Sequence, residues 1–262
     1  MTPWEPVVGG LAFAEAPRWH DGALWVSDIF GGAVHRWDEV VLEVPAWPSG
    51  TGWLPDGRML VVAMRDRQVL VVDDDGIASP YADLSGVAVA HCNDMVVHDG
   101  HAWVGNFGYE YGVEDRKPAR LAHVAPDGTV SAAADDVWFP NGIVVDGDTL
   151  LLAETPAERI TAFTIGDDGA LHDRRVWAHL DGARPDGIAL DADRGLWVAS
   201  PGTFELLRVV EGGRVTDRLD PPNGIAQACA LTGDTLYVCS TTTHDEAEAL
   251  RLRTGSVHAL AL

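Results

Sequence analysis

One pattern recurs six times along this chain and limits the folds that it can adopt. Each copy has a short loop ending in a polar residue, followed by two apolar, strand-like stretches that are joined by a glycine-containing turn. These turns are Asp21-Gly22, Asp56-Gly57, Asp99-Gly100, Asp146-Gly147, Arg194-Gly195 and Gly233-Asp234. They lie roughly 40 residues apart, and a strand-bearing repeat of that period predicts a closed ring of small sheets.

The stretches around these turns have the character of strands. They are short apolar or alternating runs, such as Met59–Ala63, Leu150–Glu154 and Leu196–Ser200, and helical periodicity is nearly absent. Further turn signals bound them at close intervals, including PDG at 126–128 and DDG at 167–169. We therefore expect an all-β fold, a six-bladed β-propeller with about four strands per blade, which forms one domain over residues 1–262.

The repeat also predicts where each blade begins and how the ring closes. We expect Trp4–Val8 to pair into the sixth blade, and Ala249–Arg253 and Val257–Leu262 to supply two further strands of that blade. The expected blade starts lie near Ala14, Pro48, His91, Phe139, Arg184 and Pro222.

Composition narrows the range of partners. The net charge is −22, from 18 basic and 40 acidic residues, and such a surface repels nucleic acid and anionic lipid heads. The first ten residues lack a basic segment and a long apolar run, so no signal peptide is expected. Three cysteines without CxxC spacing indicate neither disulfides nor a thiolate zinc site. We expect a soluble cytoplasmic protein, monomeric or weakly oligomeric, that binds a small molecule and neither nucleic acid nor membrane.

The polar residues at the heads of the repeats are the candidate site. In a propeller the innermost strand of each blade lines the central channel, so the loops that lead into these strands meet at one mouth of it. The head residues include Glu15, Asn93, Asn141 and Asp186, which offer two carboxylates and two amide oxygens. Hard oxygen donors suit Ca²⁺, with Mg²⁺ or Mn²⁺ as alternatives. Because Asn-Gly and Asp-Gly are also common tight-turn dipeptides, this pattern alone leaves a turn and a metal site both open.

Several longer motifs, taken in order, resemble a known family. They are E-x-P-x-W at 15–19, WVSDIFGGAVHRWD at 25–38, PSGTGWLPDGRMLVV at 48–62, Asn93-Asp94, PNGI at 140–143 and PDGIALDADRGLWVA at 185–199. Together they resemble the SMP-30/gluconolactonase/luciferin-regenerating-enzyme family of six-bladed propellers over the whole chain. The resemblance implies one divalent cation at the channel mouth, with Ca²⁺ favoured and Mg²⁺, Mn²⁺, Zn²⁺ or Fe²⁺ as alternatives.

The resemblance also implies roles for single residues. Glu15, Asn141 and Asp186 match the family's metal ligands, and Asn93 matches an amide that binds metal or substrate. Asp186 further matches the proposed general base. In the animal gluconolactonases an Arg two positions before the third-blade Asn grips the sugar, whereas this chain has His91 there. Glu110 is a candidate for a sugar-contacting glutamate of blade three.

The chemistry expected from this set is hydrolysis of a lactone or related cyclic ester. A metal ion would polarise the carbonyl, and a carboxylate would take a proton from water. Asp186 is the first candidate for that base, with Asp94 and His91 as further candidates. Aromatic residues in the loops at the repeat heads are expected to form an apolar rim for the substrate: Trp47, Phe107, Tyr109, Tyr111, Trp138 and Phe139. Four tryptophans on strand positions are expected in the core: Trp19, Trp25, Trp103 and Trp197.

Two other functions remain open on the sequence. The ring could be a binding propeller with a structural ion, or a biosynthetic enzyme that performs non-hydrolytic chemistry on the same scaffold. Serine hydrolase chemistry has no support, because no G-x-S-x-G motif is present.

Overall fold

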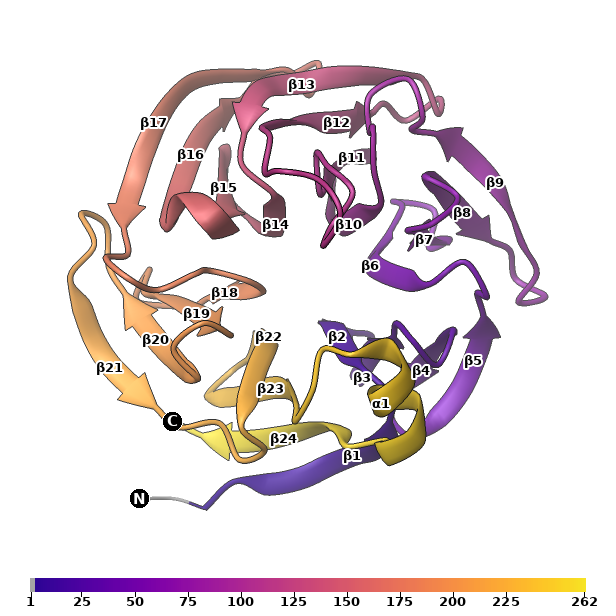
Figure 1. The fold of residues 1–262 in the computed structure, drawn as a ribbon. Helices are drawn as coiled ribbons and strands as arrows, with labels where there is room; N and C mark the ends of the chain where they lie inside the picture. The colour runs from indigo at the N-terminus through magenta and orange to yellow at the C-terminus, as the bar shows by residue number, and fades with distance from the viewer. Residues whose placement is uncertain (1–2) are drawn as a thin grey trace.

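The computed structural model describes residues 3–262 as six four-stranded antiparallel sheets arranged in a ring (Figure 1). This confirms the predicted six-bladed β-propeller. Blade one comprises β2 (Ala14–His20), β3 (Ala23–Asp28), β4 (Ala33–Arg36) and β5 (Glu39–Glu43). Blade two comprises β6 (Pro48–Trp53), β7 (Met59–Ala63), β8 (Gln68–Val72) and β9 (Ala78–Asp83). Blade three comprises β10 (Cys92–His98), β11 (His101–Asn106), β12 (Ala119–Val124) and β13 (Val130–Val137).

The second half of the chain repeats the same arrangement. Blade four comprises β14 (Pro140–Asp146), β15 (Thr149–Glu154), β16 (Arg159–Ile165) and β17 (Leu171–His179). Blade five comprises β18 (Ile188–Leu190), β19 (Leu196–Ser200), β20 (Glu205–Val209) and β21 (Val215–Leu219). Blade six comprises β22 (Ile225–Thr232), β23 (Thr235–Thr241), β24 (Gly255–Ala261) and β1 (Glu5–Leu11).

The N-terminal strand closes the ring. β1 pairs antiparallel with β24, with Glu5 opposite Ala259 and Leu11 opposite Gly255, so the two ends of the chain share one sheet (Figure 1). This confirms the expected closure by the N-terminus. The pairing covers the outer edge of β24 and makes the stability of this blade depend on both ends of the chain.

The prediction of a strand over Ala249–Arg253 was wrong, because this segment lies in helix α1 (Glu246–Leu252) and its C-cap. Asp245 caps the helix by accepting a hydrogen bond from the Glu248 N–H, and acidic residues occupy the first turn while Arg251 lies in the last. These are favourable positions for charges at helix ends. α1 connects β23 to β24, and Glu246 forms an ion pair of 3.4 Å with Arg65 of blade two. It is the only α-helix within residues 3–262, and no helix in that range is long and apolar enough to cross a membrane.

Apolar side chains fill the spaces between neighbouring sheets. Leu60 and Val62 of blade two, for example, pack in one cluster with Met95 and Val104 of blade three. Trp103 is fully buried and Trp197 nearly so, as expected, but Trp19 is 36% exposed and lies beside Trp37 and Tyr237 instead of in the core. The three cysteines are free and buried, which confirms the absence of disulfides.

Candidate functional site

The innermost strands of the six blades surround the axis of the ring (Figure 1) and begin in the same irregular way. In five blades the first residue of the inner strand pairs with the end of the second strand. The register shifts directly after this pair in blades two, three and four, and one pair later in blades one and six. These first pairs are Ala14 with Asp28, Pro48 with Ala63, Cys92 with Asn106, Pro140 with Glu154 and Ile225 with Thr241. Such a bulge bends the strand and changes the direction of its side chains.

The predicted ligands are the residues directly after these first pairs. Glu15, Asn93 and Asn141 occupy this position in blades one, three and four. Asp186 occupies the matching place in blade five, because it precedes Ile188 by two residues just as Asn141 precedes Ile143, where regular pairing resumes. The equivalent residues of blades two and six are Ser49 and Ala226. We call the end of the ring that carries these six residues the head end.

Close packing of the inner strands explains two of the glycines that follow these residues. The Gly142 N–H donates to the Asp186 carbonyl at 3.2 Å, and the Gly187 N–H donates to the Gln227 carbonyl at 2.9 Å. A Cβ atom on Gly142 would lie 2.6 Å from the Asp186 carbonyl oxygen, and one on Gly187 would lie 2.3 Å from the Ala228 Cβ. The dipeptides Asn141-Gly142 and Asp186-Gly187 are therefore contacts between blades, and the tight-turn alternative does not hold for them.

The two amide side chains are held in place through their NH₂ groups. The Asn141 Nδ2 donates to the Thr155 Oγ1 at 3.2 Å, and that hydroxyl donates to the Pro185 carbonyl at 2.7 Å. The Asn93 Nδ2 lies 3.5 Å from the Pro140 carbonyl oxygen, to which it donates. Both asparagines are buried. Because both NH₂ groups donate to atoms of blade four, the Oδ1 atoms are the oxygens that remain for a ligand.

The two carboxylates act on each other electrostatically. Burial is the main cause that raises the pKa of Glu15 to about 8; the Ala16 N–H opposes this, the Asp94 charge adds to it, and Arg18 opposes it. The pKa of Asp186 is raised well above its ordinary value, first by burial and then by the charges of Glu15 and Asp94, while the Asn141 side chain lowers it. The structure thus brings Glu15, Asn141 and Asp186 into one site, as the repeat pattern requires.

Asp94 belongs to the same site but is paired with a basic residue. Its Oδ1 lies 2.7 Å from the Arg18 Nη2 and also accepts a hydrogen bond from the Met95 N–H at 2.8 Å. Sequence analysis did not identify Arg18, although this residue lies within the E-x-P-x-W motif. The Asp94 carboxylate is therefore already engaged by the Arg18 guanidinium.

The donor set fits a hard divalent cation. Glu15 and Asp186 form no salt bridge with a basic side chain in the described residues, and the rise in their pKa values shows that an added positive charge would stabilise their ionised forms. Over residues 3–262, however, no group of three or more His, Cys, Asp or Glu side chains could hold a metal ion. A cation site here therefore needs the amide oxygens of Asn93 or Asn141, and metal binding stays a prediction.

His91 lies just before β10 among aromatic rings. Its ring centroid is 5.6 Å from that of Trp47 and 5.8 Å from that of Phe107, both edge-on. Burial lowers the pKa of His91, with further lowering by Arg65 and Arg67 and an opposing effect of Glu110. The imidazole is therefore neutral at pH 7 and can accept a proton.

Most of the predicted apolar rim is found together, although not all of it. Phe107 stacks on Phe139 with centroids 4.3 Å apart, and Tyr109 and Tyr111 lie about 6 Å from Phe139. Trp138 makes no ring contact with this group in the described structure; its backbone N–H donates to Glu154. Glu110 is exposed, and Tyr109 is buried.

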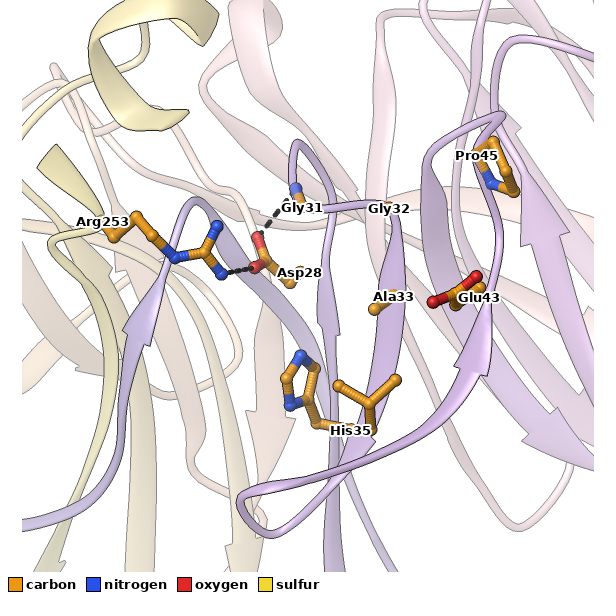
Figure 2. A pocket seen from close by; sticks show the side chains of 9 residues that line it. Asp28, Gly31, Gly32, Ala33, His35, Glu43, Pro45 and Arg253 are labelled. Carbon is orange, nitrogen blue, oxygen red and sulfur yellow. Dashed lines mark hydrogen bonds and ion pairs between the residues drawn. The ribbon is translucent and has the colours of Figure 1, made fainter. Parts of the chain in front are cut away.

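A separate cavity of about 400 Å³ lies on blade one and contains none of the predicted site residues (Figure 2). Asp28 on its wall is fully buried and accepts hydrogen bonds from the N–H groups of Ala12, Phe13 and Gly31. Arg253, which follows α1, approaches the same carboxylate at 3.3 Å. These contacts join blade six to blade one, and we assign them to ring closure.

Comparisons with known proteins agree with this architecture. The model of the family described as SMP-30/Gluconolactonase/LRE-like region matches residues 13–242. A 6-deoxy-6-sulfogluconolactonase of Pseudomonas putida is 26% identical over 253 residues, covering 90% of this chain and 86% of that protein. Pentonolactonase XacC of Haloferax volcanii is 26% identical over 254 residues, covering 91% and 84%. The crystal structure of a calcium-binding protein, regucalcin, from Agrobacterium tumefaciens has a TM-score of 0.79 at 22% identity, covering 98% of this chain and 95% of that one, which shows a shared fold.

Proposed function

The chain belongs to the SMP-30/gluconolactonase/LRE-like family, and we propose that it hydrolyses a lactone or related cyclic ester at the head end of the ring. The observation that carries this proposal is the convergence of Glu15, Asn141 and Asp186 from three blades, with the pKa values of both carboxylates raised. Relatives that are themselves lactonases support the reaction class.

The residues at the head end would hold one divalent cation through Glu15, Asn141 and Asp186, with Asn93 as a further ligand. Such an ion, when bound, supplies positive charge that polarises an ester carbonyl. Ca²⁺ is favoured because all the donors are oxygens and the amide oxygens add ligands without adding charge.

The other side chains of the site have separate roles in the proposed reaction. Asp186 would accept a proton from the attacking water. His91 is neutral at pH 7 and is positioned to accept or donate a hydrogen bond to the substrate. Arg18 holds Asp94 and orders the floor of the site by also donating to the Met95 carbonyl at 2.8 Å.

A direct assay tests the proposal. Purified protein is incubated with a panel of aldonolactones and substituted and unsubstituted aliphatic lactones, with and without chelator, and acid release is followed. We expect hydrolysis that Asp186→Asn and Glu15→Gln each reduce by a factor of about 100 or more. The matched control is Asp99→Asn, an exposed carboxylate in a turn between β10 and β11, which should leave the rate unchanged. Absence of turnover on every lactone with Ca²⁺, Mg²⁺, Mn²⁺, Zn²⁺ or Fe²⁺ present would reject hydrolysis and favour the non-hydrolytic or binding alternatives.

A further inference from the structure

We propose that the substrate carries an aromatic ring or an extended apolar chain, which packs against a row of aromatic side chains at the head end. The inference rests on the proposed function for the identity of the reacting group, but its structural basis is separate. We call this row the aromatic arc: Phe13, Phe30, Trp47, His91, Phe107 and Phe139.

Four members of the aromatic arc occupy one repeated position. Each lies two residues before the head residue of its blade, so that each leads into an inner strand: Phe13 before Glu15, Trp47 before Ser49, His91 before Asn93 and Phe139 before Asn141. The other two, Phe30 and Phe107, follow the ends of β3 and β11. In antiparallel blades these strand ends lie at the same end of the ring as the starts of the inner strands (Figure 1). The aromatic arc therefore spans blades one to four beside the predicted ligands.

The rings form a continuous series of contacts. Successive centroid distances are 4.7 Å from Phe13 to Phe30, 5.2 Å to Trp47, 5.6 Å to His91, 5.8 Å to Phe107 and 4.3 Å to Phe139. These spacings are those of interacting aromatic pairs, so each ring restricts its neighbours. A ligand would meet a preformed apolar surface and not a set of independent side chains.

This surface is partly open to solvent. Every member of the aromatic arc is only partly buried. Apolar area continues onto the β11–β12 loop, where Tyr111 is 67% exposed and Val113 73% exposed. Tyr111 itself contacts Phe107 and Phe139, with centroids 6.0 and 6.1 Å apart. Contiguous exposed apolar area of this kind marks a binding surface for an apolar group.

Few polar groups along the aromatic arc could recognise sugar hydroxyls. Arg65 lies over the Trp47 ring at 3.4 Å and forms an ion pair with Glu246, so its charge is already engaged. The polar rings beside the phenyl and indole groups of the aromatic arc are two imidazoles, that of His91 next to Trp47 and that of His244 next to Phe13. A site that selects a polyhydroxylated ring needs a partner for each buried hydroxyl. The aromatic arc instead suits a lactone or ester whose substituent is a phenyl group or an alkyl chain of several carbons.

Matched ligands test this inference. We would compare kcat/KM for δ-valerolactone, its phenyl- and hexyl-substituted forms, and glucono-δ-lactone. We expect the substituted lactones to be preferred over both others by a factor of about 10 to 100. Phe107→Ala and Phe139→Ala should each remove most of that preference, because they lower kcat/KM more for the substituted lactones than for the unsubstituted one. The control is Phe204→Ala, an exposed phenylalanine that follows β19 in blade five and should not change the preference.

A binding measurement separates this inference from the proposed function. The phenyl-substituted and unsubstituted lactams, which resist hydrolysis, are titrated into the wild type and Phe107→Ala by calorimetry. Tighter binding of the substituted lactam that the variant loses supports the inference even where no lactone is hydrolysed. Equal binding of the two lactams, or a preference for glucono-δ-lactone in the kinetic assay, would overturn it.

Discussion

The guanidinium of Arg18 in blade one lies 2.7 Å from the carboxylate of Asp94 in blade three, two blades that are not neighbours in the ring. The contact spans the inner strand of blade two, where the absence of a side chain on Gly50 matters, because a Cβ there would lie 2.1 Å from the Met95 nitrogen. The predicted ligands therefore lie beside a salt bridge that ties together separate parts of the ring.

Loss of this salt bridge should destabilise the protein. Arg18→Met leaves the buried Asp94 carboxylate without its partner, and we expect a cost of about 2 to 4 kcal/mol in the free energy of unfolding, measured by urea denaturation. Arg18→Met combined with Asp94→Asn should recover part of that loss, because the unpaired charge is gone. A single variant as stable as the wild type would show that the pair contributes no structural support.

The glycines at the blade contacts should not tolerate a methyl group. Gly142→Ala and Gly187→Ala would push a Cβ against the neighbouring inner strand, and we expect each to cost about 1 to 3 kcal/mol in unfolding free energy. Gly86→Ala is the matched control, since a Cβ there meets no atom within 4 Å and φ needs no glycine. Equal stability of all three variants would mean that the inner strands are further apart than described.

The carboxylates of the site predict how the metal-free protein responds to alkali. The pKa of Glu15 is raised to about 8 and that of Asp186 is also raised, so the folded state binds more protons than the unfolded state above about pH 4.5. Their contribution to stability is complete below that pH and is lost as pH rises through about 8. In chelator, Glu15→Gln should therefore gain stability relative to the wild type between pH 5 and 8.5. A difference in stability between the two proteins that stays constant across this pH range would contradict the raised pKa of Glu15.

A pair of histidines far from the site should make the stability of the protein depend on pH in the opposite sense, with stability lost in acid. The His101 Nδ1 and His123 Nε2 lie 2.8 Å apart, and burial followed by His101 lowers the pKa of His123, with Asp168 opposing. A lowered pKa means that the stability contribution is complete above the ordinary value of 6.5 and is lost as pH falls below it. His123→Gln should lose less stability than the wild type between pH 7 and 5 in thermal unfolding, and equal losses in the two proteins would contradict this prediction.

The repeat alone was enough to predict the architecture. Six copies of the same strand-turn-strand pattern determine the number of blades, and the apolar N-terminal segment had no other sheet to join. Helix α1 was missed because seven residues carry little periodicity, and its formation depends on the Asp245 cap and its charges. The exposure of Trp19 could not be predicted from the sequence. Alternation of apolar and polar residues along a strand does not show whether an apolar side chain lies between two blades or at the open end of one blade.

The repeat also predicts the positions of part of the candidate site. Equivalent places in a repeat converge by symmetry, which is why Glu15, Asn141 and Asp186 meet. The Arg18–Asp94 salt bridge depends on the local bulges in β2 and β10, and the sequence does not indicate which side chains such bulges turn toward each other. Phe13 and Phe30 were not among the predicted rim residues, and the structure places them at the start of a row of rings.

We propose that Glu15, Asn141 and Asp186 together hold one divalent cation on which lactone hydrolysis depends. The most direct test measures bound metal per chain by mass spectrometry alongside lactone hydrolysis, for the wild type and for Glu15→Gln combined with Asp186→Asn. We predict one equivalent of a divalent cation in the wild type and the loss of both metal and hydrolysis in the double variant, with the fold retained by circular dichroism. Hydrolysis that persists in the wild type after treatment with chelator, or in the double variant, would show that the reaction does not depend on a cation at these residues.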